Sequence, residues 1–170
     1  MLTGLILMRL ALTAALCLAF VAPAVAEQWR YEGGSTPIAW FDNGAAQFQF
    51  ACRGGALTMG FWVKTPDASL AKANTISVAI TPDAASGSAV SQSSGTSFAQ
   101  DMPLVHLDGS SVVVRGPVAQ QWARIAQQAR ETIRVAFVRM KGSGIEAIDT
   151  NVFGAKGSKS AIAHVLEKCR

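Results

Sequence analysis

The sequence contains few of the side chains on which most enzyme and metal chemistry depends. Its 170 residues include only two histidines, His106 and His164, and three cysteines. Neither histidine belongs to a cluster of cysteines and histidines with the spacing of a metal site. The sequence contains no Gly-x-Ser-x-Gly motif, which would identify a serine nucleophile that a histidine could activate. We therefore expect no metal, no cofactor and no catalytic residue, and we predict that the protein is not an enzyme.

Two other patterns resemble functional motifs without meeting their requirements. Glu146 and Asp149 lie three positions apart in a predicted strand, where odd spacing puts side chains on opposite faces and argues against a shared acid–base site. Residues 153–160, FGAKGSKS, lack the order of a phosphate-binding loop, because Gly157 is not followed directly by a lysine. A helix start with lysines and serines is able to hold an anion, but a plain strand-to-helix turn is the simpler interpretation.

A long apolar run occurs only at the N-terminus. Residues 1–26 contain no acidic side chain, and Arg9 precedes the run LALTAALCLAFVAPAVA, which ends in a small-residue triplet. This pattern predicts a secretory signal peptide over residues 1–26 that is cleaved before Glu27; an uncleaved signal anchor is the alternative. No later run approaches the length of a bilayer span, so we expect no transmembrane segment in the mature chain and a periplasmic or secreted location.

Cysteine is scarce, and its placement is informative. Cys17 leaves with the signal peptide, so the mature chain keeps Cys52 and the penultimate residue, Cys169. Two cysteines in an exported protein usually pair, because the compartment is oxidising. A Cys52–Cys169 disulfide is therefore predicted, with two free thiols as the alternative. A redox site is not expected, because such sites use closely spaced cysteines.

The mature chain, residues 27–170, has the length of one domain, and its clearest pattern is a hairpin over residues 46–64, AQFQFACRGGALTMGFWVK. Two alternating segments flank a Gly-Gly turn. Period-two alternation predicts that these side chains face the core: Phe48, Phe50, Cys52, Leu57, Met59, Phe61 and Val63. Trp62 falls on the opposite face beside Lys64, where it is either covered by another element or exposed.

Short alternating segments predict further strands over residues 29–31, 38–41, 75–81, 104–107, 111–115, 133–140 and 145–153. Residues 82–101 are rich in Ser, Gly and Ala and cannot supply a packed face of their own, so we predict a mobile loop there.

The apolar spacing changes to that of a helix at Pro117. Amphipathic helices are predicted over residues 117–131 and 158–169, with Ser158 or Ser160 as the N-cap of the second. The apolar stripes consist of Val118, Trp122, Ile125 and Ala129 in the first helix and Ile162, Val165, Leu166 and Cys169 in the second. These elements predict a single α+β domain, mostly antiparallel β-sheet or a small sandwich with two amphipathic helices.

Two stretches of the chain suggest a family. FACRGGALTMGF is a strand that ends in a cysteine, followed by a polar turn and an apolar strand, and NVFGAKGSKSAIAHVLEKC leads to the last cysteine. With Cys52, Gly157, Ala161, Leu166 and Cys169 as the main carriers, the chain resembles small exported one-disulfide proteins of Gram-negative, especially alphaproteobacterial, genomes. It is similar to the VasI-type accessory proteins of type VI secretion and, more distantly, to the invasion-associated locus B family. The resemblance implies a periplasmic location, a β-rich fold and a non-enzymatic role.

Charge is unevenly distributed along the mature chain. From Arg115 to Arg170, ten lysines and arginines stand against four acidic residues, so this half is basic and able to meet an anionic surface, although such charges usually lie on solvated faces. Export makes nucleic acid an unexpected partner.

The predicted function is a non-catalytic one, through contacts with another envelope or secretion-system protein or with the cell envelope, and the candidate surface residues are Trp62, Arg124 and Arg130. The alternative is a carrier of a small apolar ligand or lipid, held between the sheet and the helix of Trp122.

Overall fold

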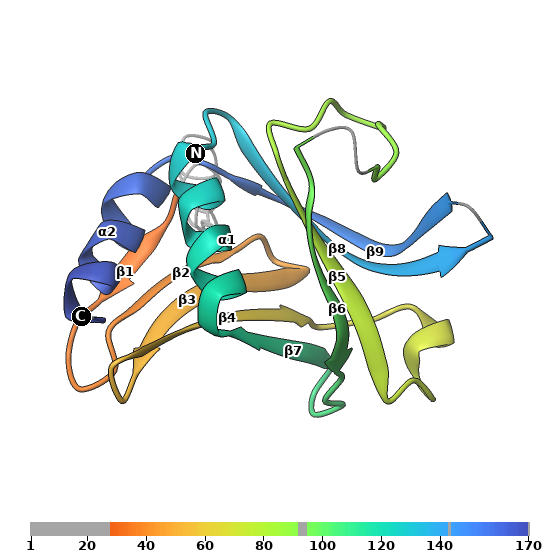
Figure 1. Cartoon of the computed structure of the whole chain (residues 1–170), viewed down its shortest axis with the longest axis horizontal. Helices are drawn as coiled ribbons and strands as arrows, with labels where there is room; N and C mark the ends of the chain where they lie inside the picture. Colours follow the sequence, from red (N-terminus) through yellow and green to blue (C-terminus); the bar gives the residue numbers. More distant parts are fainter. Residues whose placement is uncertain (1–27, 92–94, 143, 170) are drawn as a thin grey trace, which may run out of the picture.

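The computed structural model describes residues 28–91, 95–142 and 144–169 (Figure 1). The predicted signal peptide, residues 1–26, lies outside these ranges. Neither helix in the described ranges has the length and apolar character that crossing a membrane requires.

Two antiparallel sheets form the domain. Sheet A has the order β1-β2-β3-β4-β7 and sheet B the order β6-β5-β8-β9. The strands of sheet A are β1 (Arg30–Glu32), β2 (Ile38–Asp42), β3 (Ala46–Arg53), β4 (Ala56–Val63) and β7 (Ser110–Arg115). Those of sheet B are β5 (Thr75–Pro82), β6 (Ser97–Pro103), β8 (Thr132–Lys141) and β9 (Gly144–Gly154). The remaining elements are a short 3₁₀ helix, η1 (Ala68–Leu70), and the helices α1 (Gly116–Gln128) and α2 (Ser158–Lys168).

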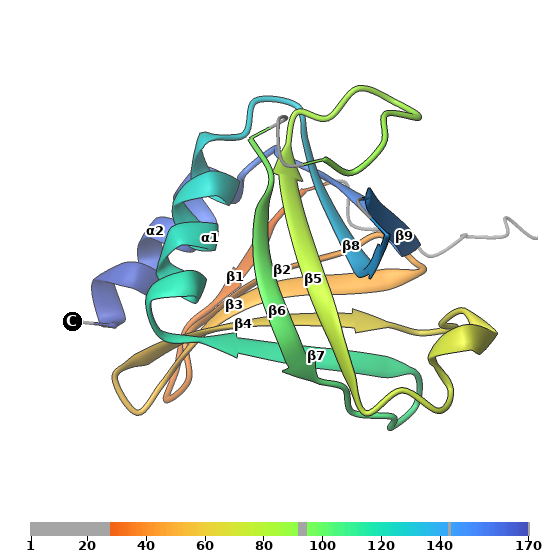
Figure 2. The ribbon, with the colours of Figure 1, turned by 45° about the vertical axis from the view of Figure 1, so that its right-hand side comes forward.

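The core lies between the sheets and beneath the helices. The strands of sheet B cross those of sheet A, and both helices lie side by side next to this crossing (Figure 2). Aromatic side chains join the sheets: the ring centroids of Phe61 and Phe137 are 4.9 Å apart, and those of Phe48 and Phe153 are 5.5 Å apart. All four side chains are fully buried. The predicted α+β fold with antiparallel sheets and two amphipathic helices is confirmed.

The predicted hairpin is formed by β3 and β4, and its inward stripe is buried as expected. Cys52 near the end of β3 is bonded to Cys169, which follows α2, with 5.5 Å between their Cα atoms. The predicted disulfide is therefore present. It attaches the end of the last helix to a central strand of sheet A.

The segment between β5 and β7 differs from its prediction. β6 begins at Ser97, inside the predicted loop of residues 82–101, while residues 104–107 form only a single bridge between Val105 and Ser111 instead of a strand. The described part of the loop also packs: Val90 is buried against Ala79 and other residues on the outer face of sheet B. The composition of the loop did not indicate this packing, because the apolar contacts of the loop are made with sheet B.

The helix ends also differ from their predictions. α1 ends at Gln128, so Arg130 lies in the connection to β8 and not in the helix. The residue before α2 is Gly157, with a φ of 83°, and neither Ser158 nor Ser160 acts as the cap. Ser158 is buried and donates its hydroxyl to the carbonyl of Ala126 at 2.8 Å. Its role is to join the two helices.

Candidate functional site

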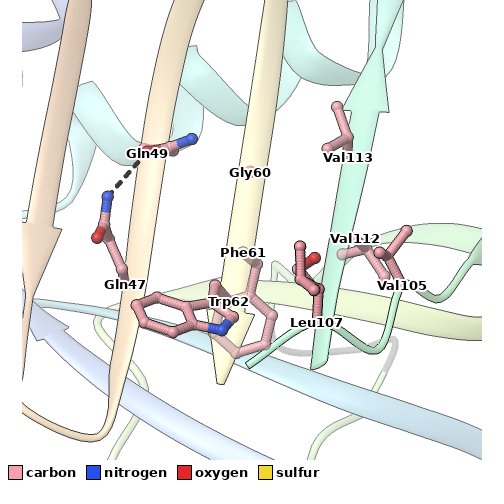
Figure 3. A pocket seen from close by; sticks show the side chains of 10 residues that line it. Gln47, Gln49, Gly60, Phe61, Trp62, Val105, Leu107, Val112 and Val113 are labelled. Atoms are coloured by element: carbon pink, nitrogen blue, oxygen red, sulfur yellow. Dashed lines mark hydrogen bonds between the residues drawn. The ribbon is translucent and has the colours of Figure 1, made fainter. Parts of the chain in front are cut away.

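The outer face of sheet A carries a shallow groove around Trp62, hereafter the Trp62 groove (Figure 3). Its volume is about 310 Å³. The lining includes Gln47, Gln49, Trp62, Val105, Leu107 and Val113. The groove is therefore assembled from β3, β4, β7 and the connection before β7.

Strand register explains the floor of the groove. Gln47 pairs across the hairpin with Trp62, and Gln49 pairs with Gly60. A Cβ atom at Gly60 would approach the Gln49 side-chain nitrogen to 2.9 Å, so the glycine leaves the space in which the Gln49 amide lies. The two glutamines are linked by a 2.9 Å hydrogen bond from the Gln47 amide nitrogen to the Gln49 amide oxygen. Polar amides therefore line one side of the groove.

Trp62 is fixed by its surroundings on the sheet. Its indole N–H donates to the Asp108 carbonyl at 2.9 Å. The Lys64 ammonium lies 5.8 Å from the indole centroid and is paired with the Asp42 carboxylate at 2.9 Å. A Cβ atom at Gly109, whose φ is 120°, would collide with the backbone of β4 and with the indole, so a glycine is required for the connection to lie against Trp62.

Three apolar side chains stand exposed around this tryptophan. Leu107 is 74 % exposed, Val105 53 % and Val113 45 %. Leu107 and Val105 come from the connection before β7, and Val113 points outward from β7 itself (Figure 3). Single exposed apolar residues are ordinary, but a group of them around a groove is typical of an interaction site.

The other two candidate residues lie elsewhere. Arg124 on α1 and Arg130 after it line a second shallow surface together with Lys159 of α2, hereafter the basic surface. No acidic side chain belongs to its lining. α1 packs against the side of sheet A that faces the core, whereas Trp62 lies on the outer face. The structure therefore brings Arg124 and Arg130 together and separates both from Trp62.

Asp83 reduces the free charge of the basic surface. Burial opposes ionisation of this carboxyl, but hydrogen bonds from the backbone N–H groups of Glu131, Arg130 and Thr132, with the nearby Arg130 charge, hold its pKa below the usual value. The Arg130 charge is thus partly compensated. Arg124 and Lys159 are the stronger candidates for contact with an anionic surface.

The histidines occupy structural positions. His106 Nε2 lies 2.9 Å from the Ala73 carbonyl, and its Nδ1 lies 2.9 Å from the Ser110 hydroxyl. Since a carbonyl only accepts, Nε2 donates to Ala73, while the Ser110 hydroxyl is able to donate to or accept from Nδ1. His164 lies against the ring of Tyr31, with 5.1 Å between centroids. Within the described ranges, no three His, Cys, Asp or Glu residues gather in an arrangement that could hold a metal ion.

The predicted separation of Glu146 and Asp149 is wrong. Asp149 pairs with Phe137 and Glu146 with Arg139, because a register shift in β9 inserts one extra residue between them. Phe137 and Arg139 are two residues apart in β8 and share a face, so the two carboxylates share one as well. Glu146 pairs with Lys141 at 3.2 Å, and Asp149 accepts from the Asp67 N–H at 2.8 Å. Both carboxylates have structural partners.

The space proposed for a carried ligand is occupied by side chains. Trp122 on α1 is fully buried, and its indole N–H donates to the Ser97 hydroxyl at 3.0 Å. Ala119, Ala123 and Ala126 on the same face are also fully buried. The region between α1 and the sheets is thus part of the core, and it does not favour the carrier hypothesis.

Comparisons of the chain with protein families, with curated proteins and with solved structures found no match. The structure defines the class of the protein as a two-sheet, one-disulfide α+β domain with an apolar groove on an outer sheet face. A function has to be argued from that surface.

Proposed function

We propose that this chain is a non-catalytic exported protein that binds a protein partner through the Trp62 groove. The observation that supports the proposal is the exposure of Val105, Leu107 and Val113 around one fixed tryptophan. Aromatic residues in partly enclosed positions frequently dominate binding energy in protein interfaces. The groove is small, so it provides the anchor of a larger contact.

The compartment is proposed to be the periplasm or the extracellular space. The N-terminal sequence pattern supports export, and a disulfide between Cys52 and Cys169 persists in oxidising compartments. The resemblance to accessory proteins of secretion makes an envelope or secretion-system protein the proposed partner.

The chemistry of the groove favours an extended segment of polypeptide as its occupant. Trp62 and Leu107 offer apolar contact to a side chain, while the amides of Gln47 and Gln49 offer donors and acceptors to a backbone. An extended segment presents both kinds of group together.

The proposal is tested by site-specific photocrosslinking in cells that produce the protein. A photoreactive amino acid in place of Leu107 is expected to give one adduct of defined mass, and the variant Val113→Glu is expected to abolish it. The matched control is the same photoreactive residue in place of Met140, which is also exposed but lies on β8.

Equal crosslinking from positions 107 and 140 would overturn the proposal, as would an adduct that Val113→Glu leaves unchanged. An adduct between two copies of this chain would mean that the Trp62 groove mediates self-association and does not bind a different protein. Retained near-ultraviolet circular dichroism in each variant shows that the fold is intact.

The basic surface supports a second candidate function, contact with the anionic cell envelope. Arg124 and Lys159 lie together without an acidic neighbour in the lining, and basic residues near an anionic lipid surface each contribute about 1 kcal/mol. Co-sedimentation with phosphatidylglycerol vesicles is expected to decrease with salt and with Arg124→Glu. Equal binding to phosphatidylcholine vesicles would refute it.

A further inference from the structure

Arg134 is a buried cation without an anionic partner among the residues that the structure describes. It lies on β8 and is only 5 % exposed. The strand register places it on the outer face of sheet B, between Thr81 of β5 and Val152 of β9. The loop between β5 and β6 lies over it, because the guanidinium bonds to Ser88 and Ala89.

The hydrogen bonds that Arg134 makes with described residues are all to neutral groups. Nη1 donates to the Ser88 carbonyl at 2.6 Å and to the Ser88 hydroxyl at 3.0 Å, and Nη2 donates to the Ala89 carbonyl at 3.4 Å. The Nε–H is buried and has no acceptor among the described residues. The Nε–H is therefore an enclosed donor that makes no hydrogen bond within the described part of the chain.

Within the described ranges, no carboxylate compensates this charge. In the described part of the chain the ion pairs are Lys64–Asp42 and Lys141–Glu146. Residues 92–94 of the same loop, which lie outside the described ranges, are glutamine and two serines. A buried charge without a counter-ion is unfavourable by several kcal/mol in general, and carbonyl contacts offset only part of this.

A cavity of about 340 Å³ adjoins the guanidinium, hereafter the Arg134 pocket. Its roof is the loop segment 84–90, and its floor includes Thr132 and Arg134 of β8 and Thr150 and Val152 of β9. Six of the twelve lining residues are alanines or valines, and Arg134 is the only charged residue among those twelve. The volume lies at the lower end of the range of small-molecule sites.

We propose that the Arg134 pocket binds a small organic anion, a monocarboxylate with a short apolar chain. The carboxylate lies beside the guanidinium and supplies the missing counter-charge to Arg134, and the threonine and serine hydroxyls of the lining donate charge-assisted hydrogen bonds to it. The apolar chain lies along the alanine and valine surface. This site is separate from the Trp62 groove, which lies on the other sheet, and it does not depend on the proposed partner.

Binding is tested by isothermal titration calorimetry with hexanoate, hexan-1-ol and inorganic phosphate on the disulfide-bonded protein. Hexanoate is expected to bind at least about tenfold more tightly than hexan-1-ol. The reason is that replacing a charged hydrogen-bonding group by a neutral one weakens binding by about this factor. Phosphate is expected to bind more weakly than hexanoate, because it lacks the apolar chain.

Three variants locate the site. Arg134→Gln removes the charge and is expected to weaken hexanoate binding about tenfold or more. Ala147→Trp, at an exposed floor position on β9, is expected to abolish binding by filling the pocket while leaving Arg134 in place. The matched control, Arg139→Gln, removes the same charge from an exposed position on the same strand and is expected to bind normally.

The proposal is overturned if hexanoate does not bind to the unmodified protein, or if hexan-1-ol binds equally well. Phosphate binding as tight as hexanoate would overturn the assignment of an apolar chain. If Arg134→Gln fails to fold, Ala147→Trp decides alone, and unchanged hexanoate binding in that variant places the ligand elsewhere and refutes the site.

Discussion

Removing the disulfide with the double substitution Cys52→Ala and Cys169→Ala should greatly reduce the free energy of unfolding. The bridge joins residues separated by 117 positions. In the chain-entropy model, a loop of this length contributes about 5 kcal/mol at 25 °C. Because a domain of this size is stable by only about 5–15 kcal/mol, the loss is a large share of the total.

The measurement is equilibrium unfolding in urea followed by tryptophan fluorescence, with the oxidised protein as reference. Hydrogen exchange adds a spatial test: α2 is expected to lose protection before β5 and β8, because the bridge holds its last turn to β3. Lys168→Ala, an exposed change in the same turn, is the matched control. A loss below about 1 kcal/mol in the double variant would refute the entropic argument.

Three further predictions concern single side chains. Gly109→Ala is expected to destabilise the protein by about 1–3 kcal/mol and to alter the fluorescence of Trp62, because the new Cβ collides with the indole and the φ is unfavourable. Phe153→Ala, which removes a fully buried ring between the sheets, is expected to cost about 3–5 kcal/mol in urea unfolding. Asp83→Asn is expected to lower the free energy of unfolding at neutral pH and to make it vary less with pH in the acid range. The folded-state pKa of Asp83 is lowered, so its contribution is present above the unfolded pKa of about 3.9 and is lost as the pH falls through the folded pKa.

Each of these predictions has a contradicting result. Unchanged stability in Gly109→Ala would mean that the connection before β7 does not lie against Trp62. A loss below about 1 kcal/mol in Phe153→Ala would mean that the sheets do not pack through this ring. If Asp83→Asn keeps the acid sensitivity of the original protein in urea unfolding at several pH values, other carboxylates cause that sensitivity. Asparagine tolerates the positive φ at position 83, so the substitution changes charge without straining the backbone.

The sequence determined which faces of the regular elements are buried. Phe48, Phe61 and Phe137 follow the period of a strand and Trp122 that of a helix, and all four lie in the core. This information is local, because alternation of apolar and polar residues assigns a face whatever the neighbouring element is. The Cys52–Cys169 bridge was also predictable, since the sequence after the predicted signal peptide offers one pair of cysteines.

The functional surfaces depended on contacts between distant segments. Trp62 was identifiable as an outward residue, but only the fold placed Leu107 beside it, more than forty positions later in the chain. Arg134 alternates like a solvent-facing residue of a strand, and its burial results from a loop that returns over sheet B. The extra residue in β9 likewise reversed the face of Glu146 relative to Asp149.

Periodicity therefore determined the core of this protein, and the tertiary path of the chain determined its surfaces. A stripe of side chains depends on backbone geometry within a few residues. A groove or a buried charge depends on which loop crosses which sheet, and the residues of such a loop obtain their apolar contacts only from the sheet they cover. For the segment around Val90, the sequence shows a polar, small-residue composition, and only the folded structure shows that it encloses Arg134.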